Sequence, residues 1–181
     1  LLGLEEMARS FSIGRLSKSP SVFDMDRLRS FNRLAIERTD SLSLIRLAGI
    51  GGEGADEDRL KEIVALVRPN AVTLNDLKGL LRPFTGGKME ASSEALSILG
   101  EPYAKAVVRA ARMEIEGLDA IDEASYGKVI ERVKEATKEK GRRLFMPIRC
   151  ALTGETEGIE LVNVLRILGR VKAVERLKGF E

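Results

Sequence analysis

Apolar residues recur at helical spacing through most of the chain, separated by short polar or glycine-containing breaks. The clearest case begins at Asp122, after which the apolar positions of residues 126–133 share one face before Gly141. No stretch shows the sustained alternation of a strand, so the predicted class is all-α. About nine helices are predicted, near residues 24–35, 41–48, 56–68, 74–83, 90–99, from 102, from 122, and after Gly158 and Gly169.

Residues that favour helix ends mark several of these boundaries. Asp24 or Asp26 is expected to cap one helix, and Asp56 another, because a carboxylate accepts hydrogen bonds from unpaired N–H groups. Pro83 is expected to stop the segment before it. Pro102 is expected to start the next helix in its first turn.

Composition removes several kinds of chemistry. The 181 residues include no histidine and one cysteine, so a histidine-based triad, a histidine-ligated metal and an internal disulfide are excluded. Cys150, in an apolar stretch, is expected to be a small core residue. The single cysteine leads us to expect a reducing, cytoplasmic setting. No apolar run is long enough to span a membrane, and no signal peptide is recognisable. Because the sequence begins at Leu1, we also expect a trimmed chain.

Two glycine-containing stretches resemble phosphate loops only in part. Residues 49–54 read GIGGEG, but the acidic residues that follow would repel a pyrophosphate, so a loop between helices is expected. Met89 follows Gly86-Gly87-Lys88 where a phosphate loop needs Ser or Thr. Carboxylates at helix starts complement the helix dipole. No nucleophile, base and oxyanion set is recognisable, which favours a binding module over an enzyme.

The net charge of +2 conceals basic ends and an acidic middle. Arg142, Arg143 and Arg149 precede a turn-rich stretch at 153–158, and further basic residues follow it. Such a pattern suits nucleic acid, because arginine and lysine contact phosphates while exposed loops contact unstacked bases. A solvated helix face with ion pairs is an equally good explanation of the pattern taken alone.

Two longer motifs favour nucleic acid. Residues 15–24 read RLSKSPSVFD, and residues 144–154 read LFMPIRCALTG. They resemble, in the same order, segments approximating SKSPAVFD and LFMPLRxALTG in bacterial glutamyl-tRNA synthetases. The resemblance implies a stem-contact tail at residues 1–40 and two helical anticodon-binding subdomains, at 41–84 and 85–181, the second a helical cage. The catalytic domain, which uses ATP and magnesium, would lie outside this chain, so no cofactor or metal site is expected within it.

Site residues follow from the resemblance position by position. Arg149 stands where the family has an arginine that contacts the anticodon region, and Gly158, Ile159 and Leu161 stand in the loop and helix start that hold anticodon bases. Arg27 matches a basic residue that contacts the tRNA stem. The sequence departs from the family at Ile159, where a proline is common, and at Ser30, where a tryptophan is common.

Asn70 is the departure with the largest consequence. Residues 68–70 read Arg-Pro-Asn, where discriminating relatives resemble Arg-Pro-Arg and use the second arginine to read a cytosine in the anticodon of glutamate tRNA. Arginine only donates hydrogen bonds, whereas asparagine both donates and accepts. Asn70 can therefore pair with cytosine or guanine, which leads to the hypothesis of relaxed discrimination between glutamate and glutamine tRNAs.

The expected function is that of a monomeric module that binds the anticodon arm of tRNA for a separate glutamate-tRNA ligase domain. The alternative is a free-standing helical protein-interaction module derived from a synthetase.

Overall fold

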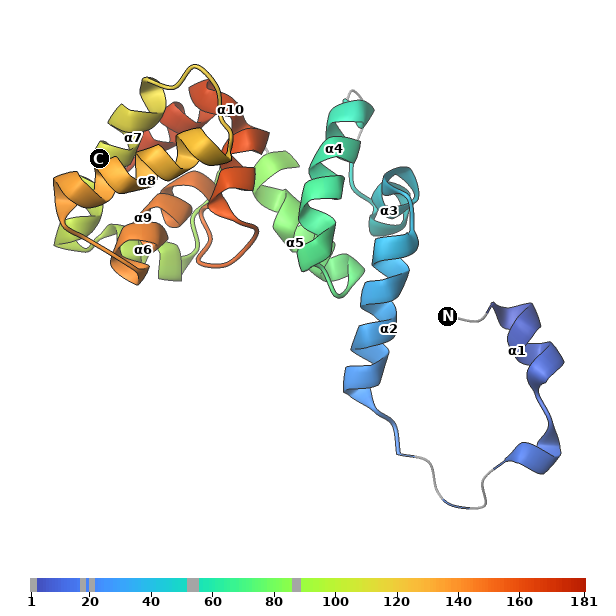
Figure 1. Cartoon of the computed structure of the whole chain (residues 1–181). Coiled ribbons are helices and arrows are strands. Elements are labelled where there is room, and N and C mark those ends of the chain that lie inside the picture. Colours follow the sequence, from blue (N-terminus) through green and yellow to red (C-terminus); the bar gives the residue numbers. More distant parts are fainter. Residues whose placement is uncertain (1–2, 17–18, 20–21, 52–55, 86–88) are drawn as a thin grey trace.

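The chain forms a series of helices in two packed groups (Figure 1), as a computed structural model shows. The structure describes residues 3–16, 19, 22–51, 56–85 and 89–181, and within these ranges it contains no strand. The predicted all-α class is therefore confirmed. The helices are α1 (Leu4–Ser10), η1 (Ile13–Arg15), α2 (Met25–Arg38), α3 (Ser41–Ala48), α4 (Glu57–Val67), η2 (Arg68–Asn70), α5 (Leu74–Thr85), α6 (Ser93–Leu99), α7 (Pro102–Glu116), α8 (Glu123–Thr137), α9 (Arg142–Thr153) and α10 (Leu161–Lys178).

The first group comprises α2 to α5 with the short 3₁₀ helix η2. Within it α3, α4 and α5 pack against one another, and α2 reaches them through η2. Leu44, Val64, Val67 and Leu77 are almost completely buried between these helices. Figure 1 shows that α2 is the long arm of the group, with its N-terminal end directed away from both groups.

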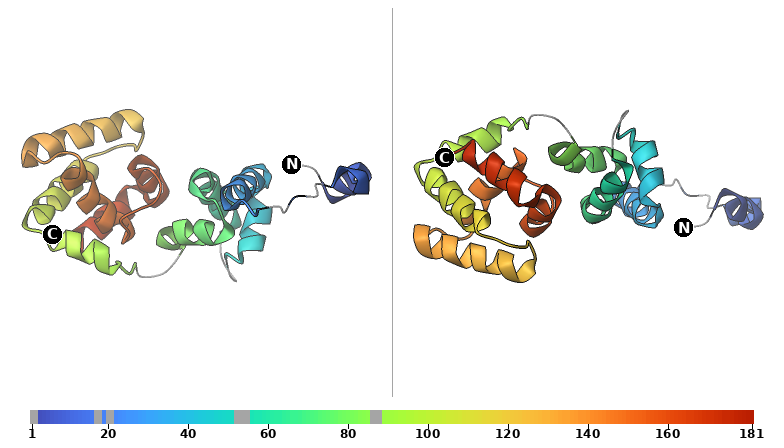
Figure 2. Two further views of the ribbon diagram at one scale, coloured as in Figure 1. Left: turned by 90° about the horizontal axis from the view of Figure 1, so that it is seen from below. Right: turned by 90° about the horizontal axis from the view of Figure 1, so that it is seen from above.

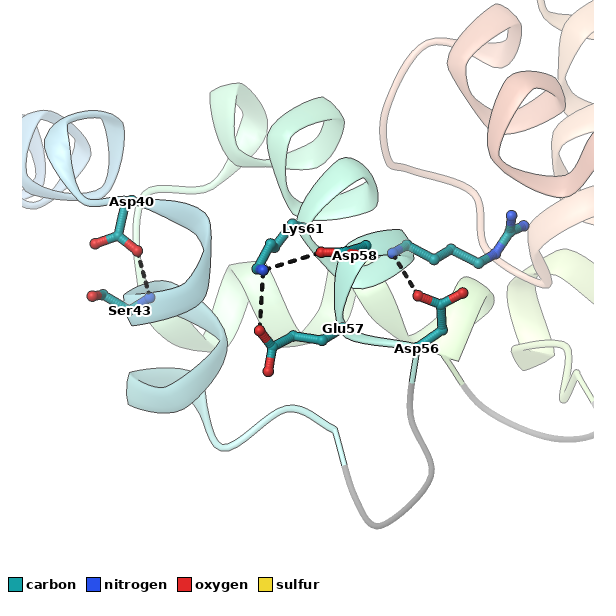
Figure 3. A network of polar contacts seen from close by, with 7 residues as sticks. Asp40, Ser43, Asp56, Glu57, Asp58 and Lys61 are labelled. Atoms are coloured by element: carbon teal, nitrogen blue, oxygen red, sulfur yellow. Dashed lines mark hydrogen bonds and ion pairs between the residues drawn. The ribbon is translucent and has the colours of Figure 1, made fainter.

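Aspartate caps define where the helices of this group begin. Asp24, Asp40 and Asp56 each accept a hydrogen bond from the backbone N–H three residues later. Figure 3 shows the caps of α3 and α4, and the bond to Ser43 holds the pKa of Asp40 below its ordinary value. In the first turn of α4, Lys61 contacts Glu57 and Asp58 at 3.0 and 3.2 Å (Figure 3). Because these carboxylates stabilise the ammonium form, the pKa of Lys61 is raised.

The second group comprises α6 to α10, with α7 at its centre. Helix α7 packs against α8, α9 and α10, and α9 also packs against α6. Two further views show this group beside the first (Figure 2). Gly169, with φ 70° and ψ 165°, divides α10 into two helical parts. This break confirms the prediction that separate helices follow Gly158 and Gly169.

The N-terminal residues contribute little to either core. Helix α1 has no buried residue, and it stands apart from the two groups in Figure 1. Eleven large apolar side chains of this region are exposed: Leu4, Met7, Phe11, Ile13, Leu16, Val22, Phe23, Met25, Leu28, Phe31 and Leu34.

Three boundaries differ from those predicted. Helix α5 continues through Pro83 to Thr85, so the proline lies inside its last turn instead of ending it. Helix α8 ends at Thr137, where Lys138 adopts a left-handed conformation, and Gly141 instead precedes α9. Helix α6 begins at Ser93, after the cap Ser92, and not near Glu90.

Helix α9 was missed altogether by the helical pattern, although it carries seven buried residues. Two sequence features lie outside the described residues: most of the SKSPS stretch (17–18 and 20–21), and positions 52–55 and 86–88 of the glycine-containing loops. In the part that is described, Gly49 ends α3 in a left-handed conformation.

Two kinds of feature are lacking over the described ranges. No helix there is both long and apolar enough to cross a membrane. Nor does any group of three or more Asp, Glu, Cys or His side chains among those residues have the arrangement of a metal site.

The reactivity of the Cys150 thiol provides a test of the packing of the second group. The Cys150 side chain is fully buried, and burial raises the pKa of its thiol to about 11. Because the reactive thiolate is rare well below that pKa, we expect a thiol-alkylating reagent at pH 8 to leave the native chain unlabelled and to label it once denaturant is added. Labelling of the native chain at the rate of a free thiol would contradict this packing.

A substitution at Gly154 provides a test of the turn after α9. Gly154 has φ +75°, and a Cβ placed there would lie 2.6 Å from the carbonyl oxygen of Glu90. Gly154→Ala is therefore expected to lower the free energy of unfolding by about 2 kcal/mol or more, from left-handed strain plus steric overlap. Gly127→Ala is the matched control, because nothing lies within 4 Å of its Cβ position inside α8. That change should raise the stability by about 0.5–1 kcal/mol in the same denaturation assay.

Candidate nucleic-acid interface

A groove of about 640 Å³ lies between α5 and the segment that connects α9 to α10. It contains residues from both helical groups, which are separated by up to 94 positions in the sequence. The lining residues are Asn70, Asp76, Gly79, Leu80, Arg82, Pro83, Phe84, Arg149, Thr153, Glu155, Thr156, Glu157, Gly158, Ile159 and Val164. Four of the residues singled out from the sequence, Asn70, Arg149, Gly158 and Ile159, are therefore brought together.

Asn70 is exposed at the end of a turn that is fixed from several sides. Arg68 donates to the carbonyl of Thr39 at 3.2 Å, and Arg33 of α2 donates to the carbonyl of Pro69 at 3.3 Å. The backbone N–H of Ala71 closes the turn onto the carbonyl of Arg68 at 3.1 Å. The backbone that carries Asn70 is thus held by its neighbours, while the side chain itself is exposed.

Arg149 lies on the opposite wall and fixes the segment that follows α9. Its Nη1 donates to the carbonyl oxygen of Ile159 at 2.8 Å. The same nitrogen lies 3.4 Å from where a Cβ of Gly158 would be, and Gly158 has φ +143°. A side chain at Gly158 would therefore press on the guanidinium. Burial lowers the pKa of the Arg149 guanidinium.

Ile159 and Leu161 contribute to this wall through packing. Their side chains are only 2% and 5% exposed, so they are anchored in the core of the second group. The Thr153 hydroxyl donates to the carbonyl of Arg149 at 2.8 Å and accepts from the N–H of Glu155 at 3.2 Å. Together these contacts anchor both ends of residues 153–161, and Gly158 is exposed at the groove.

The charges of the groove are nearly balanced. Arg82 and Arg149 supply positive charge, while Asp76, Glu155 and Glu157 supply negative charge. The Asp76 carboxylate is already bonded at the start of α5, where it accepts hydrogen bonds from the backbone N–H groups of residues 72 and 73. Carboxylates repel phosphates but accept hydrogen bonds from the amino groups of bases. The arrangement therefore suits base edges better than a row of phosphates.

Arg27 is not part of the groove. It lies in the first turn of α2, at the end directed away from both groups (Figure 1), and its side chain is exposed. Its guanidinium lies 5.7 Å from the centre of the Phe31 ring. Any contact that it makes with a ligand belongs to a second, separate surface.

Most of the arginines in the basic C-terminal stretch have structural partners. Arg143 contacts Glu139 at 2.7 Å and lies 4.0 Å above the ring of Tyr103. Arg166 lies 3.6 Å from Glu123, and Arg170 donates to a backbone carbonyl at 2.7 Å. Much of the basic stretch is therefore explained by contacts within the protein, which was the alternative to nucleic-acid binding.

The groove also contains residues that the sequence analysis did not single out, chiefly Gly79, Arg82 and Phe84 of α5. For Gly79 and Arg82 the only signal in the sequence is their position on the face of α5 away from the buried Leu77 and Leu81. Phe84 instead lies on the same side as these leucines and is partly buried against the core. Neither position shows that another wall stands opposite.

Comparison with known proteins shows which family the chain belongs to. Residues 17–180 match the family model described as the anticodon binding domain. The chain is 32% identical to a glutamate–tRNA ligase of Halalkalibacterium halodurans and 34% identical to glutamate–tRNA ligase 2 of Syntrophus aciditrophicus. These matches cover 99% and 97% of this chain, but only 39% and 37% of the relatives.

A solved glutamate tRNA ligase from Elizabethkingia meningosepticum has a similar fold, with a TM-score of 0.73 at 16% identity. The similarity covers 98% of this chain and 36% of that structure. The chain thus spans well under half the length of the ligases that it resembles. Since the family model covers nearly the whole sequence, the chain belongs to the anticodon binding domain family.

Proposed function

We propose that the groove between α5 and residues 154–160 binds bases of a tRNA anticodon loop, as part of a glutamate–tRNA ligase. The observation that carries this proposal is the meeting of Asn70 with Arg149 and Gly158 in one groove. Family membership also supports it, because the matched family model is that of an anticodon binding domain. The aminoacylation chemistry, with ATP and magnesium, would belong to regions of the ligase other than these residues.

The two walls offer complementary ways of holding a base. On one wall, Asn70 presents an exposed amide that can donate and accept. On the other, exposed Gly158 leaves the backbone open to the close approach of a flat ring, and the Arg149 guanidinium is planar. Unstacked bases are typically bound by such combinations of edge contacts and stacking.

Arg27 is proposed to contact the tRNA at a second place, along the stem. Because α2 extends away from the groove, a ligand that touched both would have to be long, as the anticodon arm of a tRNA is. Two weak contacts on one rigid ligand reinforce each other without any new interaction between them.

Binding of labelled tRNA to the full chain, measured over a range of salt concentrations, tests the proposal. We expect an affinity that falls as salt rises, because phosphate contacts release counterions. Arg82→Ala, at the exposed mouth of the groove, should weaken binding and reduce the logarithmic salt slope by about one. Lys128→Ala is the matched control, since that exposed residue lies on α8, outside the groove. Absence of binding by the folded chain would instead favour a protein-interaction module.

Arg149→Ala probes the opposite wall. We expect tRNA binding to weaken by about 1–3 kcal/mol, because the change removes a planar cation and releases the carbonyl of Ile159. Circular dichroism and thermal unfolding would verify that the helices persist. Unchanged affinity with the fold intact would reject the role of Arg149 in binding.

Asn70 is proposed to relax the discrimination between glutamate and glutamine tRNAs. We expect the native chain to bind both with similar affinity, because an amide can pair with cytosine or with guanine. Asn70→Arg should favour glutamate tRNA by about 1–3 kcal/mol, the usual value of one bidentate base contact. Parallel titrations with the two tRNAs measure this. A native preference of about 100-fold or more, or some 2.7 kcal/mol, would contradict the hypothesis.

A further inference from the structure

The two walls of the groove are tied together behind it by one arginine of α10. Arg176 donates through Nη1 to the carbonyl of Leu152 at 2.5 Å and through Nη2 to the carbonyl of Pro83 at 2.6 Å. Leu152 belongs to the last turn of α9, and Pro83 to the last turn of α5. One guanidinium therefore joins helices of the two groups.

The chemistry of helix ends explains why this tie is strong. The last four carbonyls of an α-helix have no partner within the helix, and they form the negative end of its dipole. A cation that bonds two such carbonyls stabilises both helix ends at once. The side chain of Arg176 is about half-buried, and burial lowers its pKa. The two carbonyl contacts compensate part of this cost of desolvation.

A second arginine joins the groups in the same way at a different place. Arg59 of α4 donates to the carbonyl of Ile167 in α10 at 2.7 Å. Ile167 lies in the last turn of the first helical part of α10, two residues before the break at Gly169. In contrast, all the extensively packed pairs of helices lie within one group or the other. The arginine–carbonyl contacts therefore add directed links between the groups to the apolar cluster that includes residues of both.

The position of the Arg176 tie relates it directly to the groove. Pro83, whose carbonyl it binds, lines one wall, and Thr153, which follows Leu152, lines the other. We propose that Arg176 is a positioning residue that sets the spacing of the two walls, and so the fit of an RNA base between them. The part of this inference that concerns RNA rests on the proposed function, whereas the part that concerns wall spacing does not.

Distance measurements on the full chain test the spacing without any ligand. Spin labels would be attached at Leu47→Cys in α3 and Leu96→Cys in α6, both exposed positions, with Cys150→Ala as background. Arg176→Gln is expected to broaden or shift the distribution of distances between the labels. Arg170→Gln is the matched control, because Arg170 donates to the carbonyl of Leu118 at 2.7 Å within a single group. That variant should leave the distribution unchanged.

Binding of tRNA by the same variants tests the consequence. We expect Arg176→Gln to weaken binding about tenfold, the equivalent of losing one charged hydrogen bond, with an unchanged salt slope because Arg176 does not contact phosphate. Arg170→Gln should bind as the native chain does. If Arg176→Gln fails to fold, Arg176→Lys replaces it, since an ammonium keeps the charge without the planar fork that spans two carbonyls.

The possible results separate the role of Arg176 in wall spacing from its effect on RNA binding. An unchanged distance distribution in a folded Arg176 variant overturns the role in wall spacing. A changed distribution with unaltered affinity overturns the link to RNA, and a salt slope reduced by about one reassigns Arg176 to a phosphate contact. If the native chain binds no tRNA, the proposed function fails, and the distances still decide whether Arg176 holds the walls.

Discussion

Hydrogen bonds from arginine side chains to backbone carbonyls near the ends of helices and turns hold the parts of this molecule in register. Such carbonyls lack helical partners, and a guanidinium carries both the charge and the several donors needed to bind them. The same contact recurs between α2 and η2, between the two helical groups, and within the second group. The arginines involved are Arg33, Arg59, Arg68, Arg149, Arg170 and Arg176.

This use of arginine changes how the charge of the chain is interpreted. A basic stretch in a sequence suggests an attraction for polyanions, but the cations that bind carbonyls here act first on the protein itself. In the proposed function, the electrostatic attraction of RNA would depend on fewer residues, such as exposed Arg82 at the groove and Arg27 on α2. The nearly balanced charge of the groove fits this division, because recognition of bases depends on direction more than on net charge.

Much of the fold could be predicted from the sequence, since amphipathic spacing and capping residues are local signals. Asp122 and Pro102 open helices as expected. Two predicted helix ends are wrong, because proline and glycine occur in more than one position relative to a helix. Helix α5 contains Pro83 in its last turn, and Gly141 precedes a helix instead of ending one. Helix α9 was not predicted because it contains Pro147, although its buried face is extensive.

The groove could not be predicted from local sequence patterns. Individual residues of it could be named from the motifs, but their meeting depends on contacts between segments distant in the sequence. Arg82 and Phe84 carry no motif, and only the opposing wall makes them part of a site. Conversely, Ile159 and Leu161 were expected at the site, and their side chains are in fact buried beneath it.

That burial makes the two walls unequal in their capacity to change. At residues 158–159 this wall is held by the buried Ile159 side chain and by the hydrogen bond from Arg149, so this part of it offers every ligand the same surface. Asn70 stands exposed on a braced turn, where a replacement side chain would alter the groove without disturbing a core. New ligand preferences could therefore arise in this protein by a single substitution at position 70, while residues 158–159 keep the same position on the opposite wall.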